Sequence, residues 1–123
     1  MQVIRGDNIP NSPLPFSPAI KAGGFVFVSG QASVDATGKI VNDSFEGEMR
    51  RSMENLRTIL TAAGLTFANV VQVKSYVAKP SDLPEYNRLY REYFAEPYPA
   101  RSTIVECLGI ALKFEIDVIA FAE

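Results

Sequence analysis

An arginine that follows a proline-rich junction is the first residue here whose setting suggests chemistry. Pro97 and Pro99 restrict the backbone just before Arg101, so the chain reaches this arginine in a stiff, extended form. A guanidinium carries a planar set of donors that fits a carboxylate with two hydrogen bonds, and it stays charged at any relevant pH. Arg101 is therefore a candidate for binding an acidic ligand. The alternative is a surface arginine in an ordinary ion pair.

Glu115 is the candidate for proton chemistry. In the last apolar run, strand alternation puts Phe114 and Ile116 on one face and Glu115 and Asp117 on the other. A carboxylate on a half-apolar face tends to have a raised pKa, which suits a general acid or base. The alternative is a charge on an edge strand that deters aggregation. Histidine is absent, which excludes every histidine-based catalytic triad.

Two further stretches are candidate walls of a ligand site. Gly30 follows Ser29 at the end of an apolar run and permits a ligand to approach the backbone closely; the alternative is a bulge or a strand end. Residues 8–18 carry four prolines, which predicts an extended loop. This loop either presents Phe16 to a pocket or is an ordinary surface connection.

The composition predicts one globular domain, residues 1–123, in the soluble class: 47% of residues are apolar and the net charge is -2. Twelve Lys and Arg, spread along the chain and offset by fourteen acids, argue against a nucleic-acid partner. No apolar stretch approaches the roughly 20 residues of a membrane span. The single Cys107 and the lack of a secretory signal favour the cytoplasm, and without histidine no structural zinc site is expected.

The elements that must position these residues follow from periodicity. The pattern predicts a hairpin of 19–22 with 25–29, a helix over about 44–63, a strand over 70–77, a helix beginning at Asp82, and strands over 102–107 and 113–121. This order indicates an α+β fold, a mixed sheet with two helices on one face. No helix remains for the other face, so we expect another subunit to cover it.

Several details of these elements can be tested. Asp43 with Glu46, and Asp82 with Glu85, are predicted capping boxes, and Gly64 is the predicted end of the first helix. The first helix is expected to have a solvated face, made of Glu48, Arg50, Arg51, Glu54 and Arg57. In the strand over 70–77, one face is expected to carry Val71, Val73 and Val77.

Taken together, a succession of short motifs resembles the RidA/YjgF family of enamine/imine deaminases nearly end to end. The motifs are Pro15-Phe16-Ser17-Pro18-Ala19, Phe27-Val28-Ser29-Gly30-Gln31, Asn55-Leu56 before Ala63-Gly64, Asn87 to Phe94, Pro99-Ala100-Arg101-Ser102 and Glu115-Ile116. The resemblance implies a chorismate-mutase-like fold. It also implies a homotrimer whose sheets form a central barrel, with three clefts between neighbouring subunits.

By motif position, the resemblance implies a role for each candidate residue. Arg101 would hold the substrate carboxylate, Glu115 would position or activate water, and the backbone around Ser29 and Gly30 would line the cleft together with Phe16. Two positions depart from the family pattern: Phe16 stands where the family usually has Tyr, and Thr103, a substrate-binding position, stands where it often has Cys. The missing phenolic hydroxyl changes the polarity of the pocket and hence the choice of substrate.

The resemblance implies hydrolysis of reactive enamines or imines, such as 2-aminoacrylate-like imino acids, to 2-keto acids and ammonia. Such compounds hydrolyse readily, so gripping the carboxylate and delivering water suffices, and no metal or cofactor is expected. One alternative is a non-catalytic protein that binds a small carboxylate as a regulatory ligand, motivated by the loss of the tyrosine hydroxyl. A third possibility, endoribonuclease activity, is disfavoured by the acidic balance and the absence of histidine.

Overall fold

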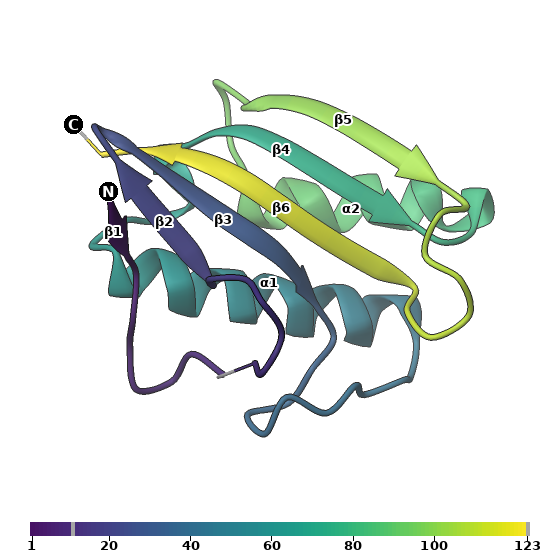
Figure 1. Ribbon diagram of the computed structural model, residues 1–123. Helices are drawn as coiled ribbons and strands as arrows, with labels where there is room; N and C mark the ends of the chain where they lie inside the picture. Colours follow the sequence, from purple (N-terminus) through teal and green to yellow (C-terminus); the bar gives the residue numbers. More distant parts are fainter. Residues whose placement is uncertain (11, 123) are drawn as a thin grey trace.

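The computed structural model describes residues 1–10 and 12–122, which form a sheet with two α-helices against one of its faces (Figure 1). The strands are β1 (Gln2–Val3), β2 (Ala19–Ala22), β3 (Phe25–Ala32), β4 (Val70–Val77), β5 (Ala100–Val105) and β6 (Phe114–Phe121), and the helices are α1 (Phe45–Ala62) and α2 (Leu83–Tyr93). Short 3-10 turns, Phe67–Asn69 and Pro80–Asp82, precede β4 and α2. The predicted α+β fold is confirmed.

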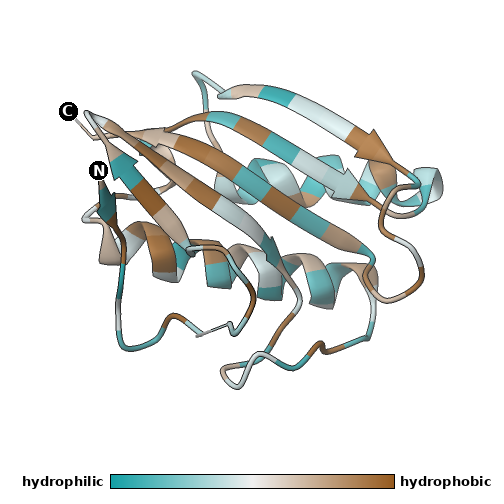
Figure 2. Cartoon of the chain, viewed as in Figure 1, coloured by the Kyte–Doolittle hydropathy of each residue, from teal (hydrophilic) through white to brown (hydrophobic). Residues whose placement is uncertain are grey.

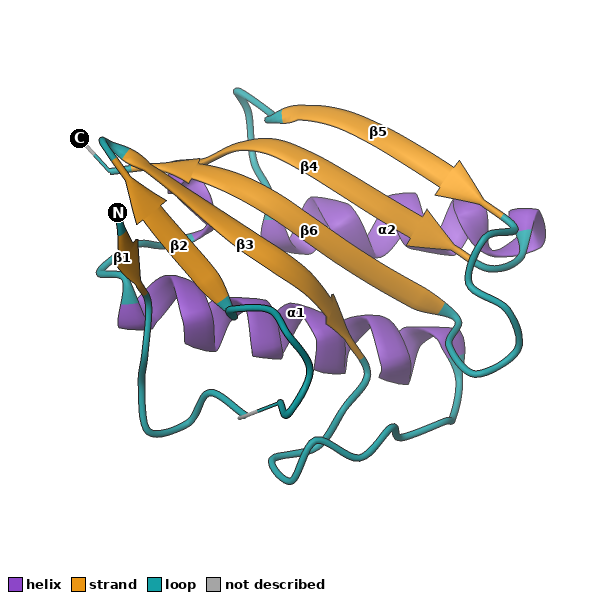
Figure 3. Cartoon of the chain, viewed as in Figure 1, coloured by secondary structure: helices purple, strands orange, loops and turns teal. Residues whose placement is uncertain are grey.

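The sheet is mixed. Its strand order is β1-β2-β3-β6-β4-β5, in which β4 and β5 are parallel and every other neighbouring pair is antiparallel. The last strand, β6, therefore lies between β3 and β4 in the middle of the sheet (Figure 3). Glu115 is on this central strand, so its interpretation as an edge-strand charge is wrong. β5 is an edge strand that begins at Ala100, earlier than predicted, and Arg101 lies inside it.

The helix boundaries are close to the predicted ones, but the caps differ. Ser44 caps α1 by accepting a backbone hydrogen bond from the first turn at 3.0 Å. The predicted capping box is wrong because Asp43 pairs with Arg51 at 2.9 Å and Glu46 pairs with another arginine. Gly64, at φ 76°, ends the helix as predicted, since a left-handed residue there costs glycine little.

The second helix shows the same kind of difference. Asp82 precedes α2 as predicted, yet its side chain makes no capping hydrogen bond. Glu85, the expected partner in that capping box, instead accepts a hydrogen bond from Arg88 at 2.9 Å. The aromatic stripe of α2 is core, as the spacing indicates, because Tyr86 and Tyr90 are buried against the sheet.

The core lies between the helices and one face of the sheet. Its largest fully buried members include Met49, Met53, Leu56, Ile59 and Leu60 from α1, Tyr86 and Leu89 from α2, and Val26, Val73, Phe114 and Ile116 from the sheet. In Figure 2, apolar and polar residues alternate along the first half of β6, whereas β3 begins with an apolar run. Burial of each large apolar side chain contributes about 1.5–3 kcal/mol, and this fixes the faces that the strands present.

One strand departs from simple alternation. Val73 and Val77 are buried as predicted, but Val71 is exposed, so the three valines do not share a face. The pairing of β4 with β6 shifts register between Val70 and Gln72. This irregularity inserts an extra residue, which reverses the orientation of the side chains before it.

The opposite face of the sheet remains open in the chain, and no described helix covers it (Figure 1). It exposes large apolar side chains, namely Phe25 and Phe27 of β3, Ile104 of β5 and Phe121 of β6. Phe27, for example, retains 45% of its accessible surface. Among the described residues, neither helix is long and apolar enough to span a bilayer.

The prediction that Glu48 belongs to a solvated helix face is wrong. Its side chain is 0% exposed and accepts hydrogen bonds from the backbone N–H groups of Asp43 and Lys113 at 3.1 and 3.0 Å. It also forms an ion pair with the Lys113 ammonium at 3.0 Å. Buried carboxylates are tolerated when they are paired and hydrogen-bonded in this way. Glu48 thus joins the start of α1 to the start of β6.

Replacing Glu48 by Ala should therefore destabilise the protein by about 2–4 kcal/mol, since it leaves buried donors unpaired and a cavity. Glu54→Ala on the same helix is the matched control, because Glu54 is exposed and pairs only with Arg57. Glu54→Ala should lower the free energy of unfolding by less than about 1 kcal/mol. Urea unfolding of both variants measures the difference, and equal losses would contradict a special role for Glu48.

Candidate functional site

Arg101 is held in a defined position on β5. Its Nη1 donates to Asn87 Oδ1 at 2.9 Å, and its guanidinium carbon lies 5.1 and 4.8 Å from the ring centroids of Tyr86 and Tyr90. These contacts come from consecutive turns of α2, so helix and strand together fix the guanidinium. Stacking on aromatic faces leaves the outward edge of the fork available. Within the described residues Arg101 forms no ion pair, so its interpretation as an ordinary surface ion-pair residue is not supported.

A cavity of about 250 Å³ opens beside this arginine. Its lining residues are Asn87, Tyr90 and Arg91 of α2, Tyr98 and Pro99 of the junction, and Arg101. Pro99, one of the two prolines predicted to stiffen the approach to the arginine, thus contributes to one wall. No acidic side chain is among the described residues that line it.

Thr103 lies two positions after Arg101 on β5 and therefore on the same face of the strand. Its hydroxyl is 3.4 Å from the hydroxyl of Tyr86, and the residue is half-buried. Arg101 and Thr103 are thus brought together, and both face α2.

Glu115 lies on the open face of β6 and is half-buried. It pairs in register with Tyr76 of β4 and Ala32 of β3. Burial raises the pKa of the Glu115 carboxyl, and the neighbouring negative charge of Asp117 raises it further. This is the direction expected for a carboxyl that exchanges protons near neutral pH.

The neighbouring carboxylate has a partner of its own. The Tyr76 hydroxyl donates to Asp117 Oδ2 at 2.8 Å. This hydrogen bond and partial burial raise the pKa of Tyr76 to about 12, so the phenol stays protonated and remains a donor. Asp117 is therefore held in place, while Glu115 has no side-chain hydrogen bond among the described residues and is available to a ligand or water.

Gly30 lies directly against Glu115. The pairing of β3 with β6 shifts between Val28 and Gln31, so Ser29 and Gly30 form a bulge opposite Asp117. A Cβ built on Gly30 would be 2.8 Å from Glu115 Oε2. The bulge, which the sequence left as an alternative to a ligand-binding backbone, is present, and it makes room for the carboxylate.

Ser29 fastens the proline-rich loop to β3 with two hydrogen bonds. Its hydroxyl donates to the Ser17 carbonyl at 2.6 Å and its backbone N–H donates to the Pro18 carbonyl at 2.9 Å. These bonds fasten the segment that carries Phe16, whose side chain is 53% exposed. Because a serine hydroxyl has a single O–H donor, Ser29 Oγ can still accept a hydrogen bond from a ligand but cannot donate one.

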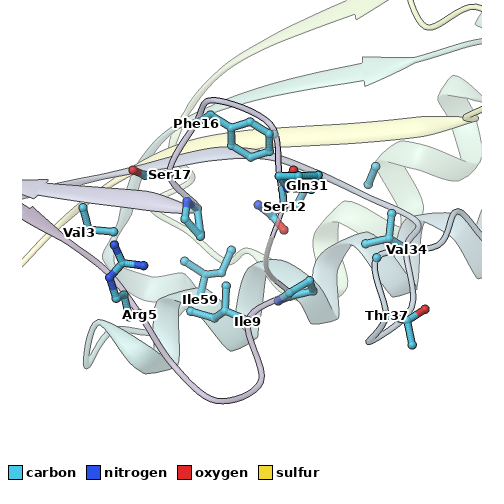
Figure 4. A pocket seen from close by; sticks show the side chains of 16 residues that line it. Val3, Arg5, Ile9, Ser12, Phe16, Ser17, Gln31, Val34, Thr37 and Ile59 are labelled. Carbon is cyan, nitrogen blue, oxygen red and sulfur yellow. The ribbon is translucent and has the colours of Figure 1, made fainter.

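A second cavity, of about 400 Å³, lies beneath this loop (Figure 4). Phe16 and Ser17 of the loop, Gly30 and Gln31 of β3 and Ile59 of α1 are among the residues that line it. Arg101 does not line it, so the predicted site residues fall into two separate groups.

Arg101 and Glu115 lie on opposite faces of the sheet. Arg101 pairs with the buried Val73, on the helix side, whereas Glu115 pairs with Tyr76, on the open side. Register partners in neighbouring strands point to the same face. One chain therefore presents an arginine half-site, with Arg101 and Thr103, and a carboxylate half-site, in which Glu115 lies against the Ser29–Gly30 bulge. Ser29 fastens the loop of Phe16 to this bulge, although Glu115 is not among the described residues that line the cavity beneath the loop.

The sequence model of the family described as Endoribonuclease L-PSP, to which RidA/YjgF proteins belong, matches residues 7–122. The chain belongs to this family. It is similar to a RutC family protein of Pyrococcus horikoshii, with 39% identity over 99% of this chain and 98% of that protein. It is also similar to the chloroplastic Reactive Intermediate Deaminase A of Arabidopsis thaliana, with 36% identity over 97% of this chain and 65% of the plant protein.

Solved structures of the RidA/YjgF family share the fold. RidA from an Antarctic Psychrobacter superposes with a TM-score of 0.89 at 30% identity, covering 98% of this chain and 99% of that one. Escherichia coli TdcF, solved with bound serine, gives 0.88 at 30% identity over 100% of both chains. The resemblance seen in the sequence motifs is confirmed.

Sequence reasoning missed two asparagines. Asn87 holds Arg101, and Asn55 of α1 donates to the carbonyls of Ala32 and Val34 at 3.0 and 3.1 Å, which secures the end of β3. Both asparagines stand in the motifs that carry the family resemblance, but no role in holding Arg101 or β3 was assigned to them. The signal that was available is position: an amide on the border between the apolar and charged faces of a helix can reach strand ends.

The environment of Glu115 can be tested without an activity assay. Carbon-13 NMR of the side-chain carboxyl should show Glu115 titrating above the ordinary glutamate pKa, and Asp117→Asn should lower that value by removing a nearby negative charge. Burial, the larger cause, should keep the pKa in the variant above the ordinary value. A Glu115 titration at or below that of an exposed glutamate would contradict this description.

Proposed function

We propose that the chain is an enamine/imine deaminase that converts imino acids to 2-keto acids and ammonia. The observation that carries this proposal is the arginine half-site: a guanidinium fixed by Asn87 and two aromatic rings, in a cavity that no described carboxylate lines. Such a site favours a small carboxylate. The likeness to a protein named Reactive Intermediate Deaminase A gives additional support.

In this proposal Arg101 binds the substrate carboxylate and thereby places the imine carbon within reach of Glu115. The ionised Glu115 takes a proton from water as the water oxygen bonds to that carbon. With the imine nitrogen protonated, this addition gives a neutral carbinolamine. Glu115 returns the proton to the amino nitrogen, and the C–N bond breaks as the C=O bond of the 2-keto acid forms. The hydroxyl proton passes to Glu115 as ammonia leaves, and the ammonia carries it away as ammonium. A raised pKa makes this carboxyl a better proton acceptor and donor near neutral pH.

We further propose that the site forms between two copies of the chain in a homotrimer. Arg101 and Glu115 lie on opposite faces of one sheet, so a single chain does not bring them together. The exposed phenylalanines and isoleucine of the open face are the kind of surface that another subunit covers. A central barrel of sheets would bury this face and bring the carboxylate half-site of one subunit to the arginine half-site of the next.

A second candidate function is that of a non-catalytic receptor for a small carboxylate. Phe16 lacks the hydroxyl that the family's usual tyrosine would provide for orienting water or substrate. The related TdcF was solved with serine, which carries a carboxylate. Arg101 suits this function as well, but a raised pKa at Glu115 has no part in it.

The two charged residues should fail in different ways when changed. Arg101→Lys keeps the charge but loses the two-pronged donor, so carboxylate binding should weaken by about 1.5–3 kcal/mol. Glu115→Gln removes the base but keeps the shape, so ligand should still bind while turnover drops by roughly 10²–10⁴-fold. Ammonia release from imines generated in situ measures turnover, and calorimetry with a 2-keto acid measures carboxylate binding. Full activity in Glu115→Gln would favour the receptor function.

Mixing two inactive variants tests the shared site directly. Arg101→Ala and Glu115→Gln chains, co-refolded in equal amounts, should form mixed trimers in which some clefts combine an intact arginine with an intact glutamate. Random assembly should restore about one quarter of the wild-type sites, because about three quarters of the trimers are mixed and each has one intact cleft.

The controls are each variant refolded alone, which should stay inactive, and a mass measurement in solution, which should give a trimer. If both residues served the same chain, mixing would restore nothing, and a monomer at micromolar concentration would contradict the assembly.

A further inference from the structure

The cavity beside Arg101 contains a second guanidinium that the mechanism above does not use. Arg91 lies in the last turn of α2 and lines the same cavity of about 250 Å³. Its Nη1 donates to the backbone carbonyl of Asn87 at 3.2 Å. Since Asn87 Oδ1 accepts from Arg101 at 2.9 Å, one residue tethers both guanidinium groups.

Neighbouring acids do not neutralise Arg91. Glu85 and Glu92, the acids of α2, form ion pairs with Arg88 or Arg50, and Arg91 forms none within the described part of the chain. Arg88 and Arg50 therefore occupy the carboxylates of α2 itself. Two like charges facing one cavity repel each other, and an anion between them removes that repulsion.

The remaining polar groups of the cavity are mostly donors. Tyr90 lines the cavity, but its hydroxyl is buried and has no hydrogen-bond partner among the described residues; burial raises the pKa of Tyr90 to about 12, so the phenol adds no negative charge to the site. Tyr98 adds a second phenol to the lining. Both oxygen acceptors of Asn87 already bind arginines. A ligand rich in acceptors and carrying two negative charges fits this set of groups.

We propose that the cavity accepts dicarboxylates, with the carboxylate next to the reacting carbon on Arg101 and the second carboxylate on Arg91. The preferred substrates are then the imino acids derived from acidic amino acids, rather than those with small apolar side chains. The assignment of these ligands as substrates rests on the proposed deaminase function, whereas their binding does not.

Equilibrium binding of stable 2-keto acids tests the second subsite. Calorimetry should show that 2-oxoglutarate binds the wild-type trimer about 10- to 100-fold more tightly than 2-oxobutyrate, the range expected for an additional charge-assisted contact. Arg91→Gln should reduce this ratio to about one.

Arg88→Gln is the matched control, because it removes the same charge from the same helix at a residue that does not line the cavity. It should leave the ratio unchanged. Equal affinities in the wild type, a ratio that survives Arg91→Gln, or the same loss in Arg88→Gln would overturn the proposal.

A kinetic comparison separates this inference from the proposed function. Imines generated in situ from aspartate, glutamate and alanine by amino-acid oxidases should be hydrolysed with a kcat/KM that favours the acidic two, and Arg91→Gln should remove that preference. A binding ratio that depends on Arg91 without any hydrolysis would sink the deaminase and leave the subsite standing. Hydrolysis of all three imines at equal kcat/KM, together with equal affinities for the two keto acids, would support the deaminase and overturn the subsite.

Discussion

The two-residue alternation of side chains along a strand sets Arg101 and Glu115 on opposite faces of one sheet. Both residues pair with β4, which lies between their strands: Arg101 is in register with the buried Val73, and Glu115 is in register with Tyr76 of the open face. A slip of one residue would move either group to the wrong face and bury a charge, so the core that fixes the register also fixes the site. Because β5 is an edge strand, its arginine stays accessible from outside the chain.

The buried Glu48 ties the helix layer to the carboxylate half-site. It accepts hydrogen bonds from the backbone and side chain of Lys113, which immediately precedes β6 and stands two residues before Glu115. The start of a central strand cannot shift without breaking these charge-assisted bonds in a site from which water is largely excluded. Stability and the position of the Glu115 carboxylate therefore depend on the same contact. On the same face of the sheet, Asn87 of α2 has the corresponding role for Arg101.

Local patterns in the sequence predicted the fold well because the relevant signals are local. The alternation in β6 and the apolar stripe of α1 each specify an element and its buried face. The burial of Glu48 was missed because its partner lies 65 residues away and no spacing rule links them. The central place of β6 was missed for the same reason: a strand at the end of the sequence inserts between two earlier ones. The motifs supplied the candidate residues, but their separation into two half-sites depends on register.

The half-sites differ in charge as well as in position. This difference would affect how the half-sites of neighbouring subunits come together in the proposed trimer. Arg91 and Arg101 make one half-site cationic, whereas Glu115 and Asp117 make the other anionic. Phe16 offers no donor and Ser29 has committed its hydroxyl to the loop, so the second half-site relies on its carboxylate and on backbone groups. Opposite charges favour the approach of one half-site to the other, while a bound carboxylate screens the arginines from the glutamate. In the proposed function, a substrate that brings two carboxylates would neutralise both guanidinium groups, so that neither of them pairs with Glu115 and the carboxylate is left to act on water.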